Sequence, residues 1–302
     1  MYKPVISIII PVRNEGDRIK NTINTFAFGR STLFHLEFVV VDDASEDGCC
    51  TLLENLLSWE RDAAIVRVIK LEQWSGIPFA RNVGANYAQA PILFITDANV
   101  AICQNWDIPL FRHLHPGKVL SAAVADTVSS CIGYGCVLRL PSMGVSWMSN
   151  PYEFEGDIPV SACAGTVIYT ALFKKLGGYD TSMPLYGAAE PEFSVRLWLY
   201  GAQIIICPDL VLWHRFRPAE ERNPFIKHIE FLQIKNYLRF ALLYLNNSDI
   251  KATLHHYFIS SPTLFKQAMQ YLETDYTIMK RKNHLQKVLL RNFDWYQNKF
   301  NN

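Results

Sequence analysis

Residues 5–15, which read VISIIIPVRNE, decide the fold class of this chain. The nearly continuous apolar run is typical of a strand that is buried on both faces of a sheet. The polar residues after Pro11 indicate that the strand ends there in a turn. Similar β-branched runs recur along the first hundred residues, separated by longer segments of mixed polarity. Strands are expected at 36–41, 65–70 and 92–96, and helices at 15–28, 46–59 and 77–89. This alternation predicts an α/β fold, with a mainly parallel sheet and helices on its faces.

The pattern changes in the middle of the chain and again after Pro218. Residues 127–159 are rich in Gly and Pro, which predicts a long loop of the kind that often serves function. The elements expected next are strands at 160–169, 203–206 and 210–213 and helices at 170–176 and 190–200. Beyond Pro218, apolar and basic residues recur at helical spacing and predict three or four helices. We therefore expect one domain over 1–217 and a helical region over 218–302.

Composition excludes several classes of protein. Of 302 residues, 50% are hydrophobic and 19% are charged, which excludes a mainly disordered chain. The formal net charge of +1 argues against a nucleic-acid binder. Residues 218–302 nevertheless hold 12 Lys and Arg against 7 Asp and Glu. This excess, densest at Lys280–Lys282, suggests peripheral contact with an anionic membrane, and a homodimer formed through the same helices is the other expectation.

The seven cysteines contain no C-x-x-C pair, and their odd number favours reduced intracellular thiols. No stretch has the length and apolarity of a transmembrane helix, and the first residues lack the features of a signal peptide. The sequence thus predicts a cytoplasmic protein, or one that is peripheral at the membrane.

Polar clusters follow three of the expected strands, and in an open parallel sheet ligands bind at these carboxyl ends. The clusters are Pro11–Glu15, Asp42-Asp43 and Asp97–Asn99. The glycine patterns of a dinucleotide fold and of a P-loop are absent from the first turn. A diphosphate at this acidic edge would therefore require a divalent cation.

Asp97, Asn99 and His214 are the candidate metal ligands. In an extended segment, residues 97 and 99 project to the same side, so both oxygens can meet one cation. His214 follows an expected strand, and an imidazole ligand would favour Mn²⁺ over Mg²⁺. A histidine after a strand is often structural, which is the alternative interpretation of His214.

Glu190 and Glu192 open the helix expected at 190–200. Glu192 and Arg196 are spaced i,i+4, which predicts a structural ion pair. Glu190 lies at the cap position, where a carboxylate base is plausible.

Four ordered segments carry a resemblance to a known family. They are VISIIIPVRNE at 5–15, VVVDDAS at 39–45, ARNVG at 80–84 with PILFITD at 91–97, and GGYD at 177–180 with YGAAEPEFSVRLW at 186–198. In this order they resemble the family 2 nucleotide-sugar glycosyltransferases of GT-A fold, and the resemblance covers about 1–217. The last segment, with HRFR at 214–217, is also similar to the polypeptide N-acetylgalactosaminyltransferases.

The resemblance implies a nucleotide-binding half over 1–100 and an acceptor-binding half over 101–217. It implies roles for nine residues: Pro11, Arg13, Glu15 and Asp43 at the base and ribose, Arg81 near the base or diphosphate, Asp97, Asn99 and His214 at Mn²⁺ or Mg²⁺, and Glu190 as catalytic base. Asp97 would also contact the donor. Two positions depart from the family pattern: Ala189 replaces the first acid of the E-D motif, and Asn99 replaces the second Asp of D-x-D.

The implied activity is metal-dependent transfer of a sugar from a nucleoside diphosphate sugar, expected to be UDP-linked, to a hydroxyl group with inversion. The acceptor is left open among glycans, lipid-linked molecules and polypeptides. The alternative is a catalytically weak protein of the same fold that binds nucleotide sugars or acts as a scaffold.

Overall fold

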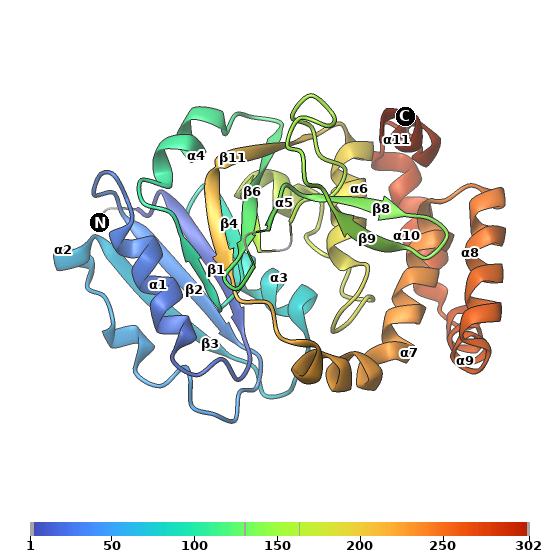
Figure 1. The fold of residues 1–302 in the computed structure, drawn as a ribbon, viewed down its shortest axis with the longest axis horizontal. Helices are drawn as coiled ribbons and strands as arrows, with labels where there is room; N and C mark the ends of the chain where they lie inside the picture. Colours follow the sequence, from blue (N-terminus) through green and yellow to red (C-terminus); the bar gives the residue numbers. More distant parts are fainter. Residues whose placement is uncertain (1–2, 130, 163, 301–302) are drawn as a thin grey trace.

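The computed structural model describes residues 3–129, 131–162 and 164–300. A twisted sheet occupies one half of the molecule and the C-terminal helices occupy the other (Figure 1). Within the described residues, nine strands form one mixed sheet in the order β3-β2-β1-β4-β10-β6-β11-β5, with β7 beside β6. The first four strands are parallel and are those expected from the sequence: β1 (Ile6–Val12), β2 (Leu36–Asp42), β3 (Ala64–Lys70) and β4 (Ile92–Thr96).

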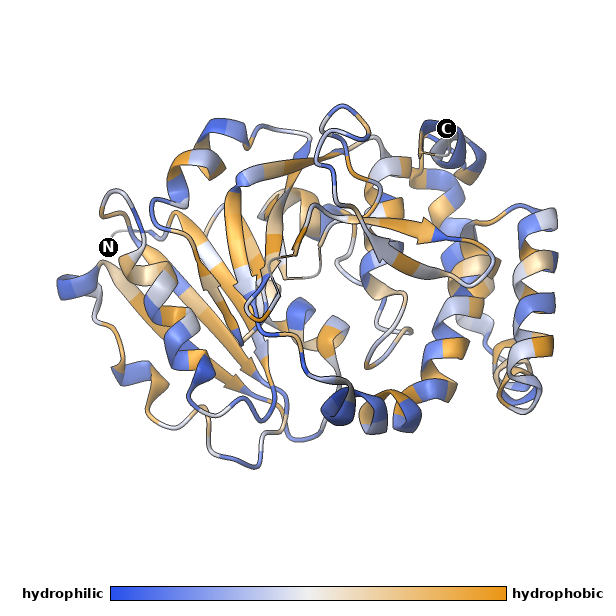
Figure 2. Ribbon diagram, in the orientation of Figure 1, coloured by the Kyte–Doolittle hydropathy of each residue, from blue (hydrophilic) through white to orange (hydrophobic). Residues whose placement is uncertain are grey.

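Alternate residues of the central strands enter two different cores, one on each face of the sheet. Ile8 packs with α1 (Arg18–Phe28) and α4 (Asp107–His113) on one face. Ile9 packs on the other face with α3 (Ile77–Tyr87) and α6 (Ala189–Tyr200). Figure 2 shows the resulting apolar character of the strands. A β-carbon added at Gly84 would lie 2.5 Å from Cγ2 of Ile9, so this glycine permits the close approach of α3 to β1.

The prediction of a helix at 46–59 is wrong. The segment holds a turn, a short 3₁₀ helix η1 (Leu53–Asn55) and the start of α2 (Trp59–Asp62). Two carboxylates bond the backbone of this turn: Asp42 accepts from the Ser45 N–H at 2.9 Å, and Asp47 accepts from the Cys49 N–H at 3.0 Å. Such local side-chain bonds compete with helix formation and explain the difference.

The second half of the sheet is less regular than the sequence suggests. Three elements follow β4 where none was expected: β5 (Val100–Ile102), α4 and β6 (Lys118–Asp126). The segment expected as a loop contains β7 (Ile132–Gly133) and a hairpin of β8 (Cys136–Arg139) and β9 (Gly144–Trp147). The helices expected at 170–176 and 190–200 are confirmed as α5 (Thr170–Lys175) and α6, whereas β10 (Gly165–Tyr169) covers only the second half of the strand expected at 160–169.

The two strands expected at 203–206 and 210–213 are one strand, β11 (Gln203–His214). Its pairing with β6 shifts between Cys207 and Val211, around Pro208, which cannot donate to a sheet ladder. His214 is the last residue of this strand and lies opposite Val100 of β5 and Asp126 of β6. The irregular strand thus ends at the edge where the polar clusters gather.

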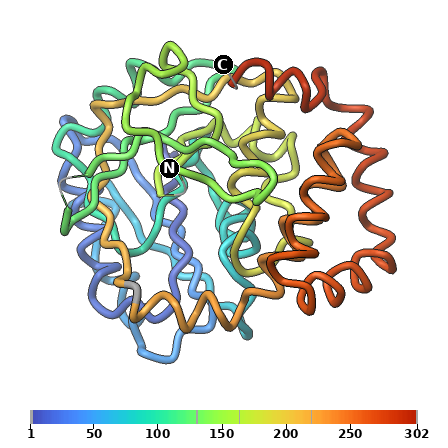
Figure 3. The backbone as a smooth tube through the Cα atoms, turned by 45° about the vertical axis from the view of Figure 1, so that its right-hand side comes forward, coloured from blue at the N-terminus to red at the C-terminus, as the bar shows by residue number. Residues whose placement is uncertain are grey.

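The described part of the C-terminal region, residues 218–300, contains five helices rather than the expected three or four. They are α7 (Ala219–Tyr244), α8 (Asn247–Ser260), α9 (Pro262–Glu273), α10 (Tyr276–Val288) and α11 (Phe293–Phe300). Figure 3 shows them packed beside the segment around α6. The apolar core on the α6 face continues into them, and the rings of Trp198 and Phe300 lie 5.1 Å apart. The expected boundary at 217 therefore separates two parts of the chain that share one core. None of the helices among the described residues is long and apolar enough to span a bilayer.

The expected pair of Glu192 and Arg196 is present, but it is buried. Two hydrogen bonds join the guanidinium to the carboxylate, at 2.8 and 2.9 Å, and the two side chains are 0–1% exposed. Tyr244 of α7 donates its hydroxyl to the same carboxylate. Arg196 also donates to the carbonyl oxygens of Leu176 and Gly178. This pair thus joins α6, α7 and the turn after α5.

We predict that Glu192→Gln lowers the free energy of unfolding by about 3 kcal/mol, because removing one partner leaves a buried charge unpaired. A surface i,i+4 pair is worth only a few tenths of a kcal/mol. The matched control is Asp17→Asn, whose i,i+3 partner Lys20 is 2.7 Å away in an exposed pair. Urea denaturation measures both variants. Equal losses in the two would contradict the argument from burial.

Candidate functional site

Arg81 lies at the centre of the candidate site. Its side chain extends from α3 and is 1% exposed. Nη2 lies 2.9 Å from Oδ1 of Asp97, just after β4, and Nη1 lies 2.7 Å from Oε1 of Glu190, in the first turn of α6. The guanidinium also lies over the ring of Tyr179, 5.5 Å from its centroid. One buried cation therefore connects segments that are distant in the sequence, since Arg81 and Glu190 are 109 positions apart.

The second oxygen of Asp97 faces His214. Nε2 of His214 lies 3.5 Å from Oδ2. The imidazole of His214 and the guanidinium of Arg81 therefore contact different oxygens of the same carboxylate. Burial raises the pKa of Asp97, but the hydrogen bond to His214 and the charge of Arg81 together outweigh it, and the net pKa lies below its usual value. Asp97 is therefore an anion at neutral pH.

Asn99 is held beside this pair. Its Nδ2 donates to the carbonyl oxygen of Arg215 at 3.2 Å, so the oxygen of the amide is the atom left to serve as a ligand. Nδ1 of His214 is buried and has no hydrogen-bond partner among the described residues. No group of three His, Cys, Asp or Glu side chains in the described part of the chain could hold a metal ion.

These residues fit a hard cation only in part. Asp97 supplies a charged oxygen, His214 an imidazole nitrogen and Asn99 a neutral oxygen, which is a mixed donor set that suits Mn²⁺. The neighbouring charge of Arg81 opposes a cation at the same carboxylate. A cation here therefore needs further oxygens from a bound anion.

A second group of predicted residues lies at the carboxyl ends of β1 and β2. Both oxygens of Asp43 accept backbone N–H bonds, from Ser75 at 2.7 Å and from Gly76 at 2.8 Å. Burial raises the pKa of Asp43 and the two N–H bonds only partly offset it, so the net pKa is raised. Gly76 is the N-cap of α3, where a carboxylate complements the helix dipole. Asp43 thus fixes the start of the helix that carries Arg81.

Arg13 and Glu15 connect the end of β1 to neighbouring segments through hydrogen bonds and ion pairs. Nη1 of Arg13 donates to the carbonyl oxygens of Asp43 and Ala44 at 2.7 and 2.6 Å. Glu15 pairs with Arg18 at 2.8 Å and with Arg217, beyond β11, at 2.6 Å. Pro11 lies within β1, opposite Val41 of β2.

Sequence reasoning missed the aromatic residues at this edge. Trp74, in the loop between β3 and α3, lies 4.9 Å beneath the guanidinium of Arg13. Its ring is also 6.2 Å from that of Phe225 and 6.4 Å from that of His228, both in α7. The position of Trp74 after an expected parallel strand is the signal that could have identified it.

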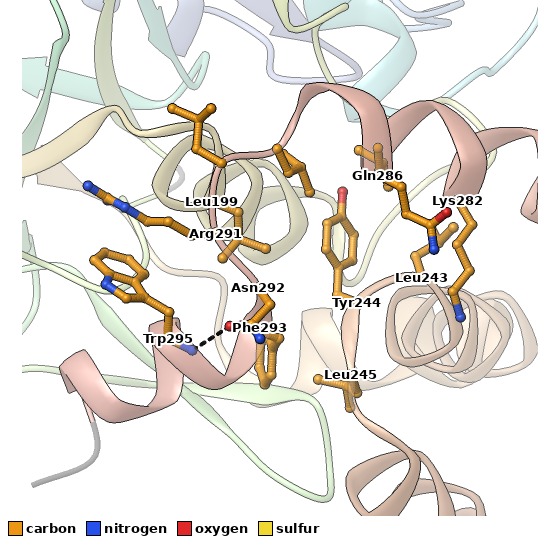
Figure 4. A pocket seen from close by; sticks show the side chains of 13 residues that line it. Leu199, Leu243, Tyr244, Leu245, Lys282, Gln286, Arg291, Asn292, Phe293 and Trp295 are labelled. Carbon is orange, nitrogen blue, oxygen red and sulfur yellow. Dashed lines mark hydrogen bonds between the residues drawn. The ribbon is translucent and has the colours of Figure 1, made fainter.

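A cavity of about 660 Å³ lies away from this edge, between the end of α6 and the helices α7, α10 and α11 (Figure 4). Leucines form much of its wall, and Lys282, Arg291 and Trp295 add polar and aromatic groups. None of the predicted site residues lines it, so it does not mark the same site.

Residues 7–134 match the family model for glycosyl transferase family 2. Polypeptide N-acetylgalactosaminyltransferase 3 of Taeniopygia guttata is 26% identical over 97% of this chain and 49% of its own length. The chain thus spans about half the length of the curated relatives it matches.

Two solved structures are similar in fold. The structure of GalNAc-T7 with UDP, GalNAc and Mn²⁺ has a TM-score of 0.74, with 19% identity, over 99% of this chain and 57% of that one. The mannosyltransferase PcManGT from Pyrobaculum calidifontis, with GDP-Man and Mn²⁺, has a TM-score of 0.58, with 18% identity, over 90% of this chain and 75% of that one. The predicted fold class and the family resemblance are confirmed: the chain has the GT-A glycosyltransferase fold, and residues 7–134 carry the sequence pattern of glycosyl transferase family 2.

Proposed function

We propose that this protein is a glycosyltransferase that moves a sugar from a nucleoside diphosphate sugar, with UDP as the nucleotide, to a hydroxyl group of an acceptor. The observation that carries the proposal is the pair of salt bridges from Arg81 to Asp97 and Glu190. These salt bridges hold Asp97, at the end of β4 on the proposed donor side, near Glu190, in the first turn of α6 on the proposed acceptor side. The relatives support the same activity, since they are named as glycosyltransferases and the solved ones hold UDP or GDP-Man with Mn²⁺.

On the donor side, the residues at the ends of β1 and β2 would bind the nucleotide. Asp43 and Arg13 fix the loops around the base and ribose through their backbone bonds, and Pro11 and Glu15 shape the same edge. Asp97, His214 and Asn99 would hold Mn²⁺ or Mg²⁺, which neutralises charge that develops on a leaving diphosphate. Arg81 lies close enough to Asp97 to orient its carboxylate toward that position.

On the acceptor side, Glu190 would accept the proton of the attacking hydroxyl. Its side chain is 18% exposed, so it is reachable from solvent while Arg81 keeps it in place. Attack from this side, opposite to the diphosphate, gives direct displacement with inversion. Proton NMR of the product as it forms measures the outcome, and a product with the anomeric configuration of the donor would contradict this role of Glu190.

The acceptor is a glycan, a lipid-linked molecule or a polypeptide. The other candidate function is a weakly catalytic protein of this fold that binds nucleotide sugars. It is favoured by the two departures at Ala189 and Asn99. Binding of UDP without transfer to any acceptor class would support it over the enzyme.

We predict that Asp43→Ala weakens UDP binding by roughly 1–3 kcal/mol, the usual cost of leaving hydrogen-bonding groups unpaired. The control is Asp107→Ala, since Asp107 is 2% exposed and holds the N–H and hydroxyl of Ser31 at 2.7 and 2.6 Å in a similar way. Calorimetric titration with UDP measures both. Unchanged affinity in Asp43→Ala, or an equal loss in the control, would overturn the placement of the nucleotide.

Glu190→Gln should fold and bind UDP, yet turn over about 10²- to 10⁴-fold more slowly, which is the usual contribution of a positioned base. The glutamine keeps the shape of the side chain and loses its charge. Glu155→Gln, at an exposed loop position, is the control. Initial rates of sugar transfer measure both, and an active Glu190→Gln would exclude Glu190 as the base.

We expect activity to depend on a divalent cation and to be lost with chelator. Because cation affinity follows the charge of the ligands, Asn99→Asp should lower the Mn²⁺ concentration that half-saturates turnover. His214→Ala should abolish the metal-dependent rate, since it removes a protein ligand. Activity that survives chelation, or that ignores both substitutions, would contradict metal dependence, and Arg81, Arg215 and Arg217 would then be the first cations to test.

A further inference from the structure

Helix α7 holds the segment that leads into α6. Nζ of Lys235 donates to the carbonyl oxygen of Ser182 at 3.1 Å, and Nε of Arg239 lies 3.2 Å from Oδ2 of Asp180. Between them in α7, Asn236 is 0% exposed. These three neighbouring side chains of one helix face thus fix a segment about 50 residues earlier in the chain.

Asn236 makes the most contacts with this segment. Its single Nδ2 lies 3.0 Å from the carbonyl oxygen of Pro184, 3.1 Å from that of Tyr186 and 3.3 Å from that of Gly187. An amide nitrogen carries only two hydrogens, so the three carbonyls share them. A buried donor with several backbone acceptors sets the path of the chain more strictly than one bond does.

The segment needs such support, because its backbone is strained. Leu185 has a φ of 62° and Ala188 a φ of 67°, values that side chains other than glycine rarely adopt. Ala188 is the N-cap of α6, and Glu190 follows two residues later. The conformation of 184–188 therefore determines where the carboxylate of Glu190 lies relative to Arg81.

The same segment contacts the donor side. Leu185 forms a β-bridge with Gly76, and a β-carbon at Gly76 would lie only 2.4 Å from Cα of Leu185. Gly76 in turn donates its N–H to Asp43. Asn236 thus supports one side of a contact whose other side is held independently by Asp43.

We propose that Asn236 is a positioning residue for the transfer reaction: its amide fixes residues 184–187 so that Glu190 is placed against Arg81. The proposal rests on the proposed function, in which Glu190 is the base. It assigns to the C-terminal helices a direct part in the geometry of the site. Because Asp43 holds the donor side separately, loss of Asn236 should slow turnover and leave UDP binding nearly unchanged.

The test compares Asn236→Asp with wild type. Aspartate has the same shape but lacks the two amide hydrogens, so at most the single proton of its neutral form is left for the three carbonyls. We expect kcat to fall about 10- to 100-fold, since a displacement of about 1 Å costs that much. The Kd for UDP should stay within twofold. Asn236→Ser, which keeps one hydroxyl donor, should fall between the two and serves if the aspartate variant does not fold.

The control for stability is Leu272→Ala in α9, a buried apolar position on a helix that packs against α7. It should lower the melting temperature and leave kcat within twofold. If it slows turnover as much as Asn236→Asp does, or if both Asn236 variants keep wild-type kcat, Asn236 has no positioning role.

Hydrogen exchange provides a readout that is independent of activity. In Asn236→Asp, the amides of 182–190 should exchange faster than in wild type, and in Leu272→Ala their protection should change little. Unchanged exchange in Asn236→Asp overturns the proposal even if wild type transfers no sugar. A wild type without transfer, together with faster exchange in Asn236→Asp, would refute the proposed function and leave the contact itself established.

Discussion

The site depends on one buried guanidinium. Arg81 is 1% exposed, and an arginine so placed is tolerated only when its charge is paired and its N–H groups are bonded. Asp97 and Glu190 pair this charge from two different elements, the end of β4 and the start of α6. The need to pair one cation therefore fixes α3, β4 and α6 relative to one another, and the same need brings the two acids of the proposed reaction together.

The C-terminal helices also contain basic side chains that pair with acids inside the protein. Their basic excess is directed partly inward: Arg239 pairs with Asp180 and Asp275, and Nη2 of Arg281 lies 3.9 Å from Oε1 of Glu192. Lys282 donates to the carbonyl oxygen of Leu242. Two of the three residues in the cluster at 280–282 thus contact the protein itself, and less positive charge faces solvent than the sequence suggests. Membrane contact and self-association through this region stay predictions.

The sequence predicts those features that depend on local pattern. The buried strands β1, β2 and β4 are nearly continuous apolar runs, and the acids at their ends identify the site edge. Strand β6 was not foreseen, because its centre, Ser121–Ala125, consists mostly of small residues with no strong strand preference. The positions of Trp74 and Asn236 depend on contacts with segments distant in the chain, which no spacing rule reports. The roles of the nine predicted site residues follow from resemblance, and the structure adds which of them meet.

The two departures from the family pattern have a common electrostatic effect. Ala189 is 2% exposed, so a carboxylate at that position would be buried within a residue of Glu190. Arg81 already bonds two carboxylates, and a third buried acid beside it would need another cation as its partner.

Alanine at 189 and asparagine at 99 each remove one negative charge from the site. The remaining acids, Asp97 and Glu190, exceed Arg81 by a single charge, which repels an incoming diphosphate less than the full motif would. The same reduction weakens the attraction for a free cation. Under the proposed function, a site of this charge would bind the cation and the diphosphate together rather than the cation first.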